Sequence, residues 1–139
     1  MEMDLNYWNQ AISWGLFVLI WVVQLVHYPS FRYIDKDKFT AFHQHHTKRI
    51  SIIVLPLMLL ELGLAGVLSI TSNFHWHYLV PLILVLLIWA STFLLQVPDH
   101  NELATGHNRE VSDRLVRTNW MRTILWSCKA WWLWWFTSL

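Results

Sequence analysis

The stretch ISIIVLPLMLLELGLAGVLSI, residues 50–70, decides the fold, because it is 21 residues long and holds only one charged residue, Glu61. A helix needs about 20 mostly apolar residues to cross the hydrocarbon core of a bilayer. Three further runs have a similar length and character. We therefore predict an all-α, integral membrane four-helix bundle with spans at roughly 11–29, 50–70, 78–97 and 120–139.

The composition favours a membrane location. Of the 139 residues, 55% are hydrophobic and 14% are charged, whereas a soluble domain carries about 25% charged residues. The length fits a single domain, residues 1–139, whose expected partner is the lipid bilayer. The formal net charge of +1 gives no reason to expect nucleic acid as a partner. The single cysteine, Cys128, excludes a disulfide framework and a multi-cysteine metal site.

Lysine and arginine residues in the connections indicate the orientation. The segment 71–77, between the second and third spans, has none. The other two connections hold eight in all, namely Arg32, Lys36, Lys38, Lys48, Arg49, Arg109, Arg114 and Arg117. The positive-inside rule then predicts a multi-pass cell membrane protein with both charged connections in the cytoplasm and both chain ends outside.

The helices of spans two and four are expected to extend beyond the lipid on the charged side. Asp35 or Asp37 can cap a helix that begins well before the second span. Pro56 lies within that helix and is predicted to kink it. A turn and a polar connector are predicted after Pro98, and the fourth helix is predicted to begin around Val111.

Two ionisable residues lie deep in the predicted spans. At 1.5 Å per residue, Glu61 is about 16 Å beyond Ile50, and Lys129 is about 14 Å beyond Trp120. Both helices run inward from the same side, so the two depths match. Because a charge at mid-bilayer is costly without a partner, we predict an ion pair between Glu61 and Lys129. Its simplest role is a structural clasp between helices.

Four histidines are predicted to gather at the cytoplasmic mouth of the bundle. His27 ends the first span, with Gln24 on the same helical face as a predicted ligand-binding residue, and His100 follows the third span. His43 and His46 are three residues apart and can converge on one ion. Imidazole is a common neutral metal ligand. The set predicts a site for zinc, copper or iron, or for a haem; the alternative is a row of surface histidines facing lipid headgroups.

The start of span four suggests a ligand pocket. Asn119, Arg122 and Trp126 are spaced by three and four residues and therefore share a helical face. Arg122 can snorkel to the interface. Alternatively, it can hold an anionic or phenolate oxygen while Trp120 and Trp126 stack on an aromatic ligand. Gln96, at the end of span three, can supply another hydrogen bond. A pocket that is apolar above and polar below is typical of a small-molecule site.

Two segments carry a resemblance to a known family. The sequence QVPDHNELATG, residues 96–106, followed by DRLVRTNWMRTILW, residues 113–126, resembles the signature of the anthrone-oxygenase-like family of small four-helix membrane proteins. The chain departs from the family at Asp99 and His100, where an apolar residue and an asparagine are more usual. LVHYPSF and FHQHHTKRIS, residues 25–31 and 42–51, resemble instead a histidine-bearing branch of bacterial proteins. The positions aligned with the anthrone-oxygenase-like signature are Pro98, His100, Asn101, Leu103, Asn119 and Arg122.

The resemblance implies oxidation of a small aromatic or quinone-like molecule. On that hypothesis Asn119, Arg122 and His100 are the catalytic residues, and a His-bound metal or haem activates oxygen. A version without any cofactor uses a histidine as a general base, so that the substrate anion reacts with oxygen. The alternative is a non-enzymatic membrane transport, carrier or assembly protein whose histidines bind metal or face the lipid. We also expect a homo-oligomer, because small residues near Gly63 and Gly66 allow close helix packing.

Overall fold

The chain forms four long helical stretches joined by short connections in a computed structural model that describes residues 2–137. The first stretch comprises α1 (Glu2–Val22), the π-helix η1 (Val23–His27), α2 (Tyr28–Ser30) and the 3-10 helix η2 (Phe31–Tyr33). The second is α3 (Lys36–Thr71). The third comprises α4 (Trp76–Ser91), the π-helix η3 (Thr92–Gln96) and α5 (Val97–Leu103), and the fourth is α6 (Arg109–Thr137).

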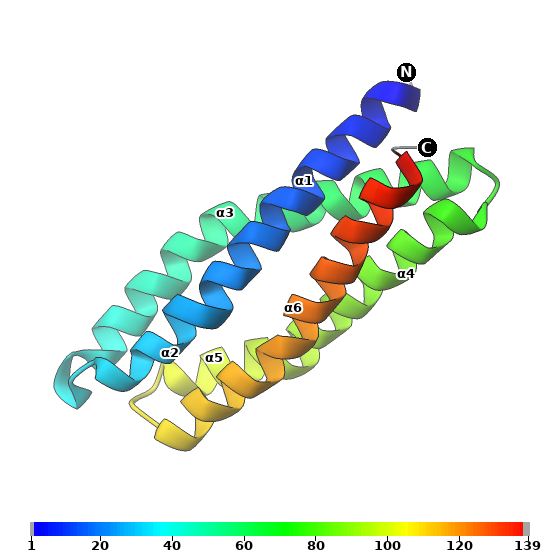
Figure 1. The fold of residues 1–139 in the computed structure, drawn as a ribbon. Helices are drawn as coiled ribbons and strands as arrows, with labels where there is room; N and C mark the ends of the chain where they lie inside the picture. Colours follow the sequence, from blue (N-terminus) through cyan, green and yellow to red (C-terminus); the bar gives the residue numbers. More distant parts are fainter. Residues whose placement is uncertain (1, 138–139) are drawn as a thin grey trace.

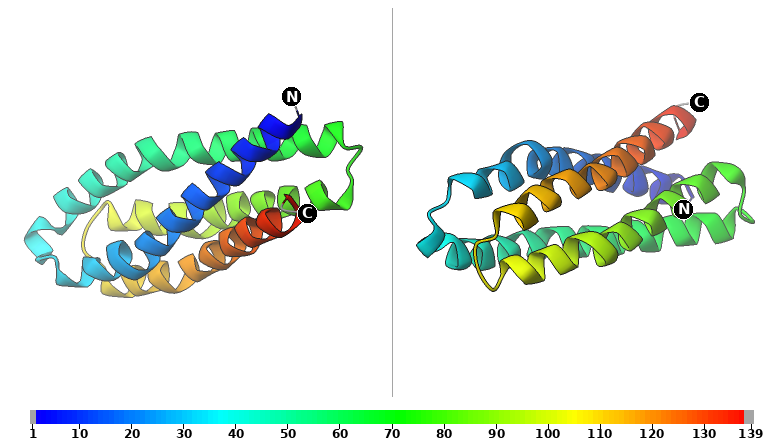
Figure 2. Two further views of the ribbon diagram at one scale, coloured as in Figure 1. Left: turned by 45° about the horizontal axis from the view of Figure 1, so that its top comes forward. Right: turned by 90° about the horizontal axis from the view of Figure 1, so that it is seen from below.

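These stretches pack as an all-α four-helix bundle (Figures 1 and 2). The α1 helix packs against α3 and α6, and α4 packs against the same two helices, so α3 and α6 face each other diagonally. The α2–α3 and α5–α6 connections lie together at one end of the bundle, which we call the charged end, and the α3–α4 turn lies at the other (Figure 1). The predicted gathering of both cation-rich connections at one end is therefore confirmed.

Three stretches of the described chain are long and apolar enough to cross a membrane: Leu5–Tyr33, Lys36–Thr71 and Trp76–Leu103. This supports a multi-pass membrane protein. The predicted fourth span, in α6, is not among them. Its segment 120–137 holds six tryptophans and two cations, and the indole N–H makes tryptophan less apolar than its size suggests.

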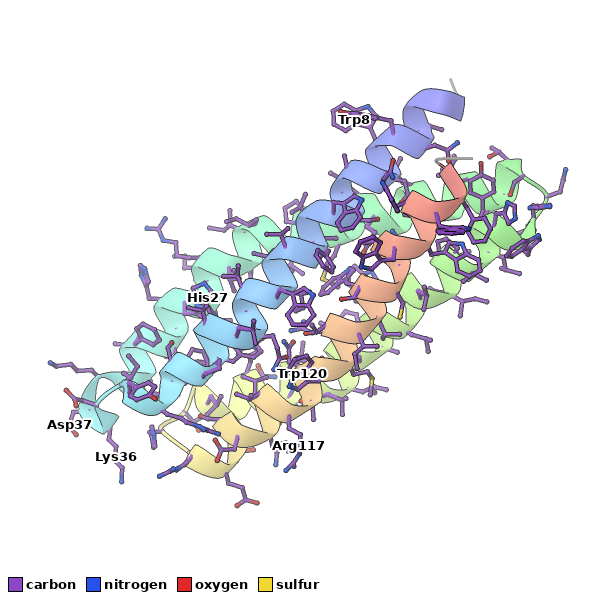
Figure 3. All side chains as sticks on the ribbon, in the orientation of Figure 1. Trp8, His27, Lys36, Asp37, Arg117 and Trp120 are labelled. Atoms are coloured by element: carbon purple, nitrogen blue, oxygen red, sulfur yellow. The ribbon has the colours of Figure 1, made fainter. Side chains whose placement is uncertain are left out.

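Apolar side chains cover much of the outside of the bundle, while many interior residues are polar. For example, Ile52, Leu59, Leu86 and Leu94 are all more than half exposed. In contrast, Glu61, Asn119 and Lys129 belong to the fully buried residues. Charged Lys36 and Asp37 project from the charged end, and Trp8 projects outward near the opposite end (Figure 3). This distribution suits a lipid environment, in which the outer surface need not be polar.

The predicted helix boundaries are partly confirmed. The second long helix begins at Lys36 and continues through Pro56 to Thr71, and the fourth begins at Arg109, two residues before the predicted Val111. Asn108 caps the fourth helix, because its Oδ1 accepts the backbone N–H groups of residues 110 and 111 at 3.1 and 3.3 Å. The turn and polar connector predicted after Pro98 are present but begin only at residue 104. A proline is tolerated in the first turn of a helix, and α5 carries the chain helically to Leu103.

Candidate functional site

Two π-helical segments shape the charged half of the bundle. In η1 the N–H of Tyr28 bonds to the carbonyl of Val23, and in η3 the N–H of Val97 bonds to the carbonyl of Thr92. Each segment is followed by a proline, at positions 29 and 98. A proline has no N–H and its ring clashes with the carbonyl four residues earlier, so the helix cannot keep its regular bonding there. Such π-segments occur frequently at functional sites.

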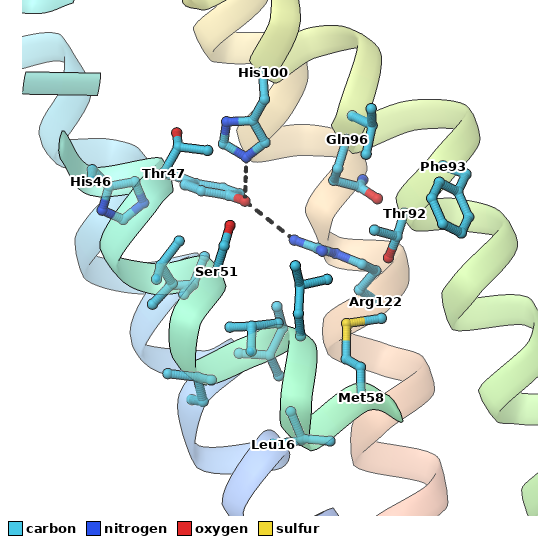
Figure 4. A pocket seen from close by; sticks show the side chains of 18 of the residues that line it. Leu16, His46, Thr47, Ser51, Met58, Thr92, Phe93, Gln96, His100 and Arg122 are labelled. Carbon is cyan, nitrogen blue, oxygen red and sulfur yellow. Dashed lines mark hydrogen bonds between the residues drawn. The ribbon is translucent and has the colours of Figure 1, made fainter. Parts of the chain in front are cut away.

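A cavity of about 360 Å³ lies between these segments, α3 and α6. Figure 4 shows Gln96, His100 and Arg122 around one part of the cavity and Leu16 and Met58 at the other. Its polar lining comprises Tyr28, His46, Thr47, Ser51, Thr92, Gln96, His100, Asn101 and Arg122. The remaining lining is apolar and comes from α1, η1, α3, η3, α5 and Trp126 of α6. The predicted polarity of the pocket, apolar at one end and polar at the other, is therefore present.

The cavity reaches the outer surface of the bundle between α3 and the η3–α5 stretch. Leu55 on α3 lines the cavity and is 47% exposed, and on the other side Phe93 and Val97 line it with exposures of 59% and 38%. The mouth is thus framed by apolar side chains on the surface that suits lipid.

Arg122 is held in a fixed orientation at the polar end. Its Nε donates to Asn119 Oδ1 at 2.9 Å, and Asn119 Nδ2 donates to Gln24 Oε1 at 2.8 Å. Gln24 Nε2 in turn donates to the Val116 carbonyl at 3.1 Å. The predicted common face of Asn119 and Arg122 is confirmed by this contact. Asn119 and Gln24 do not line the cavity; they lie behind the guanidinium and position it.

The charge of Arg122 has no carboxylate partner among the described residues. Its hydrogen bonds go to Asn119 and to the Tyr28 hydroxyl, and its guanidinium carbon lies 5.9 Å from the centre of the Trp126 ring. Arginine stays protonated in proteins, and its side chain here is only 6% exposed. The cavity therefore has a buried, uncompensated positive charge at its polar end, where an anionic group can bind.

A chain of hydrogen bonds leads away from Arg122. Arg122 Nη2 donates to Tyr28 Oη at 3.2 Å, and Tyr28 Oη lies 3.0 Å from His100 Nε2 (Figure 4). His100 Nδ1 then lies 3.0 Å from His43 Nε2. The other ring nitrogen of His43, Nδ1, is buried and has no hydrogen-bond partner among the described residues. Sequence reasoning missed Tyr28, because only His27 was taken as a site residue from the segment LVHYPSF, residues 25–31.

The four predicted histidine ligands lie close together but form two pairs. His43 and His100 share a hydrogen bond, while the rings of His27 and His46 lie 5.2 Å apart. Both ring nitrogens of His100 are engaged in hydrogen bonds. Within residues 2–137 no group of three or more His, Cys, Asp or Glu side chains is arranged to hold a metal ion. Two buried imidazole nitrogens lack a partner in this region, His43 Nδ1 and His46 Nε2.

The two predicted aromatic walls differ. Trp126 lines the cavity and is 2% exposed. Trp120 does not line it: it is 40% exposed and packs edge-on against Trp21, with the ring centres 5.6 Å apart. Gln96 lines the cavity as predicted, accepting from Ser91 Oγ at 3.2 Å.

The predicted ion pair between Glu61 and Lys129 is confirmed, with Lys129 Nζ 3.0 Å from Glu61 Oε1 and both side chains fully buried. Lys129 also donates to Ser13 Oγ and, at 3.3 Å, to Asn9 Oδ1. Trp126 Nε1 donates to Glu61 Oε2 at 3.0 Å. The ion pair therefore joins α1, α3 and α6, and Trp126 connects it to the cavity.

A second ion pair fixes α5 against α6 at the charged end. Arg114 Nε donates to Asp99 Oδ1 at 2.8 Å, and its Nη2 lies 3.2 Å from Glu102 Oε2. The hydrogen bond to Asp99 raises the pKa of the Arg114 guanidinium above its ordinary value. Because Asp99 is the neighbour of His100, this pair helps to hold the helical turn that carries the histidine.

Comparison of this chain with protein-family models, with curated proteins and with solved structures gives no match.

Proposed function

We propose that this chain is a membrane-embedded oxidoreductase of the oxygenase-like type that acts on a small aromatic or quinone-like molecule. The observation that carries the proposal is the guanidinium of Arg122, which has no carboxylate partner among the described residues and lies at the polar end of a cavity whose other end is apolar. An acidic phenol or a cyclic enol fits both ends of the cavity. Its apolar ring suits the apolar end, and its deprotonated oxygen is an anion that suits Arg122. A pocket of a few hundred Å³ with a few converging polar groups is typical of small-molecule sites.

Tyr28 and His100 supply the acid–base groups that the cofactor-free version of the chemistry requires. A hydroxyl group bound near Arg122 is also near the Tyr28 oxygen, because Arg122 Nη2 and Tyr28 Oη are 3.2 Å apart. Removing the proton makes the aromatic ring more electron-rich and easier to oxidise. Molecular oxygen, which dissolves in lipid, is the proposed oxidant. The charge of Arg122 stabilises the substrate anion.

The resemblance to the anthrone-oxygenase-like family fits the same proposal. Of the residues that carry it, Arg122 and Asn101 line the cavity, and Asn119 orients Arg122. The proposed arrangement in the cell membrane has four spans, with α6 as the fourth, both charged connections in the cytoplasm and the chain ends outside. Under that arrangement the catalytic groups lie in the cytoplasmic half.

Two observations favour alternatives. The unpartnered nitrogens of His43 and His46 are the donors that a metal-dependent version would use. The apolar mouth between α3 and the η3–α5 stretch suits a carrier that exchanges its ligand with the lipid without altering it. Elemental analysis and a visible spectrum of the purified protein test the first alternative, because a stoichiometric metal or haem would show in one or both.

The proposal is tested with 4-nitrophenol, a small phenol whose anion is yellow and whose neutral form is nearly colourless. Titration of purified protein should give a bound anion, and Arg122→Gln should weaken its binding by about tenfold or more, roughly 1.4 kcal/mol. Arg117→Gln is the matched control, because Arg117 lies on the same helix and is exposed. Equal affinities for the two variants would contradict the proposed site.

Oxygen uptake separates the enzyme from the carrier. Wild-type protein supplied with a simple hydroquinone should consume oxygen, and Arg122→Gln should lose most of that activity. Binding of 4-nitrophenol without oxygen uptake would favour the carrier.

A further inference from the structure

We propose that Tyr28, His100 and His43 form a proton relay, which takes a proton from a ligand hydroxyl in the cavity and delivers it to His43 Nδ1. This inference rests on the proposed function, because it requires an acidic ligand beside Arg122. It goes further in naming the path of the proton and in giving His43, which does not line the cavity, a role in the site.

The first step is the direction of the hydrogen bonds at Tyr28. Arginine only donates, so the Tyr28 oxygen accepts from Arg122 Nη2 at 3.2 Å. A tyrosine hydroxyl has one hydrogen and two acceptor positions. The contact with His100 Nε2 at 3.0 Å can therefore run either way. The remaining donor or acceptor position of Tyr28 is left for a ligand, because its side chain lines the cavity.

The second step is that the hydrogen positions on Tyr28, His100 and His43 must change together. A neutral imidazole carries its hydrogen on one nitrogen only. If Tyr28 donates to His100 Nε2, then His100 carries its hydrogen on Nδ1 and donates to His43 Nε2, and His43 carries its own on Nδ1. If His43 donates from Nε2 instead, then His100 donates from Nε2 to Tyr28, and the Tyr28 hydrogen is free to point into the cavity. We call these arrangements the accepting and the donating state.

Passing from the accepting to the donating state moves one proton along the whole chain. The ligand O–H bond breaks and its proton binds the Tyr28 oxygen, while the Tyr28 proton moves to His100 Nε2. The Nδ1 proton of His100 moves to His43 Nε2, and the Nδ1 proton of His43 leaves to a water molecule. The ligand becomes an anion beside Arg122, and the three relay groups are neutral before and after. Protonation of the product reverses every transfer.

Packing holds the relay in place. His43 is 1% exposed. Its ring is stacked on Phe39 at a centroid distance of 5.8 Å and lies edge-on to Phe31 at 5.7 Å. Two aromatic rings therefore fix the imidazole plane, so that Nε2 points to His100. A histidine needed only to fill this apolar site would leave a polar nitrogen buried at a cost in free energy. His43 Nδ1 is the ring nitrogen of the relay without a hydrogen-bond partner among the described residues, so the relay ends there and its proton must pass to a water molecule that enters the site.

The experiment is ¹⁵N NMR of protein labelled at histidine, which distinguishes the two imidazole tautomers, with signals assigned from single His→Gln variants. Two phenols of similar shape are compared at neutral pH: 4-nitrophenol, which the site should bind as the anion, and 4-ethylphenol, which stays neutral and donates its hydrogen. The expected result is Nε2–H on both His43 and His100 with 4-nitrophenol, and Nδ1–H on both with 4-ethylphenol. His45, exposed on the same helix, should not respond.

Tyr28→Phe keeps the aromatic packing and removes the first link, so the two phenols should then give the same tautomers at His43. The relay is overturned if His43 keeps one tautomer with both bound phenols in the wild type, or if His43 and His100 carry opposite tautomers. Absorbance reports separately whether 4-nitrophenol binds. A wild type that binds neither phenol overturns the proposed function itself, and the relay with it.

Discussion

Glu61 on α3 and Lys129 on α6 lie 3.0 Å apart across the diagonal of the bundle, with both side chains fully buried. The pair joins two helices that are not neighbours around the bundle, and Lys129 also reaches Asn9 and Ser13 of α1. The pair therefore connects three helices at one depth of the bundle.

The ion pair should respond very differently to single and double substitution. Glu61→Gln or Lys129→Met alone leaves one buried charge unpaired, which should cost about 3–5 kcal/mol. The double variant should recover most of this loss, because both desolvated charges are removed. Thermal unfolding in detergent measures all three. A double variant as unstable as the worse single variant would show that the pair is not the structural clasp that we describe.

Asn119→Asp should weaken binding of anionic ligands. The new carboxylate would lie beside the Arg122 guanidinium, which now donates to Asn119 Oδ1 at 2.9 Å, and would neutralise the charge that the cavity offers. We expect a loss of about tenfold in affinity for 4-nitrophenol, roughly 1.4 kcal/mol. Asn108→Asp, at the N-cap of α6, is the control and should bind normally. Unchanged affinity in Asn119→Asp would mean that the anion does not bind at Arg122.

Filling the cavity should abolish binding without unfolding the protein. Val54 lines the cavity, so Val54→Trp places an indole inside it. Ile53→Trp is the matched control, because Ile53 is 54% exposed on the same helix. Binding of 4-nitrophenol should be lost only in Val54→Trp, with similar thermal unfolding of the two variants. Retained binding in Val54→Trp would place the ligand elsewhere.

The two arginine–aspartate pairs at the charged end should differ in importance. Arg114→Ala leaves Asp99, whose side chain is 5% exposed, as a buried carboxylate without its main partner. Arg32→Ala breaks a pair with Asp113 in which both side chains are exposed, at 48% and 40%, and such pairs contribute little. The midpoint temperature of thermal unfolding should therefore fall clearly further in Arg114→Ala than in Arg32→Ala. The opposite order would contradict the role given to Asp99.

Sequence reasoning succeeded where the position of a residue along the helix axis follows from the constant rise per residue. The depth of Glu61 and Lys129 follows from counting residues, and so does the convergence of His43 and His100 at one end of the bundle. In each case the axial position is fixed by the number of residues from the edge of an apolar run. A residue at the same axial position on another helix could then be named as the partner, although the direction of its side chain around that helix was not known.

The direction of side chains around the helix was harder to predict. Trp120 and Trp126 are both aromatic and close in sequence, but only Trp126 points inward, because α6 packs between α1 and α4. Tyr28 was missed for a related reason. Its position depends on the π-segment before it, and the only signal in the sequence was a proline inside a long apolar run. The helical continuation after Pro98 was missed because a proline favours a helix start as well as a turn.

Each π-segment also determines how the chain length can vary. It contains one residue more than a regular turn, and each residue turns an α-helix by about 100°. Because the wide turn absorbs this extra residue, deleting Leu94 would leave Gln96 and His100 close to their present directions, whereas deleting a residue from the regular part of α4 would rotate both by about 100°. In any set of homologous sequences, one-residue gaps within the helical stretches should therefore fall in the segments 23–27 and 92–96 and avoid the regular turns of α1 and α4.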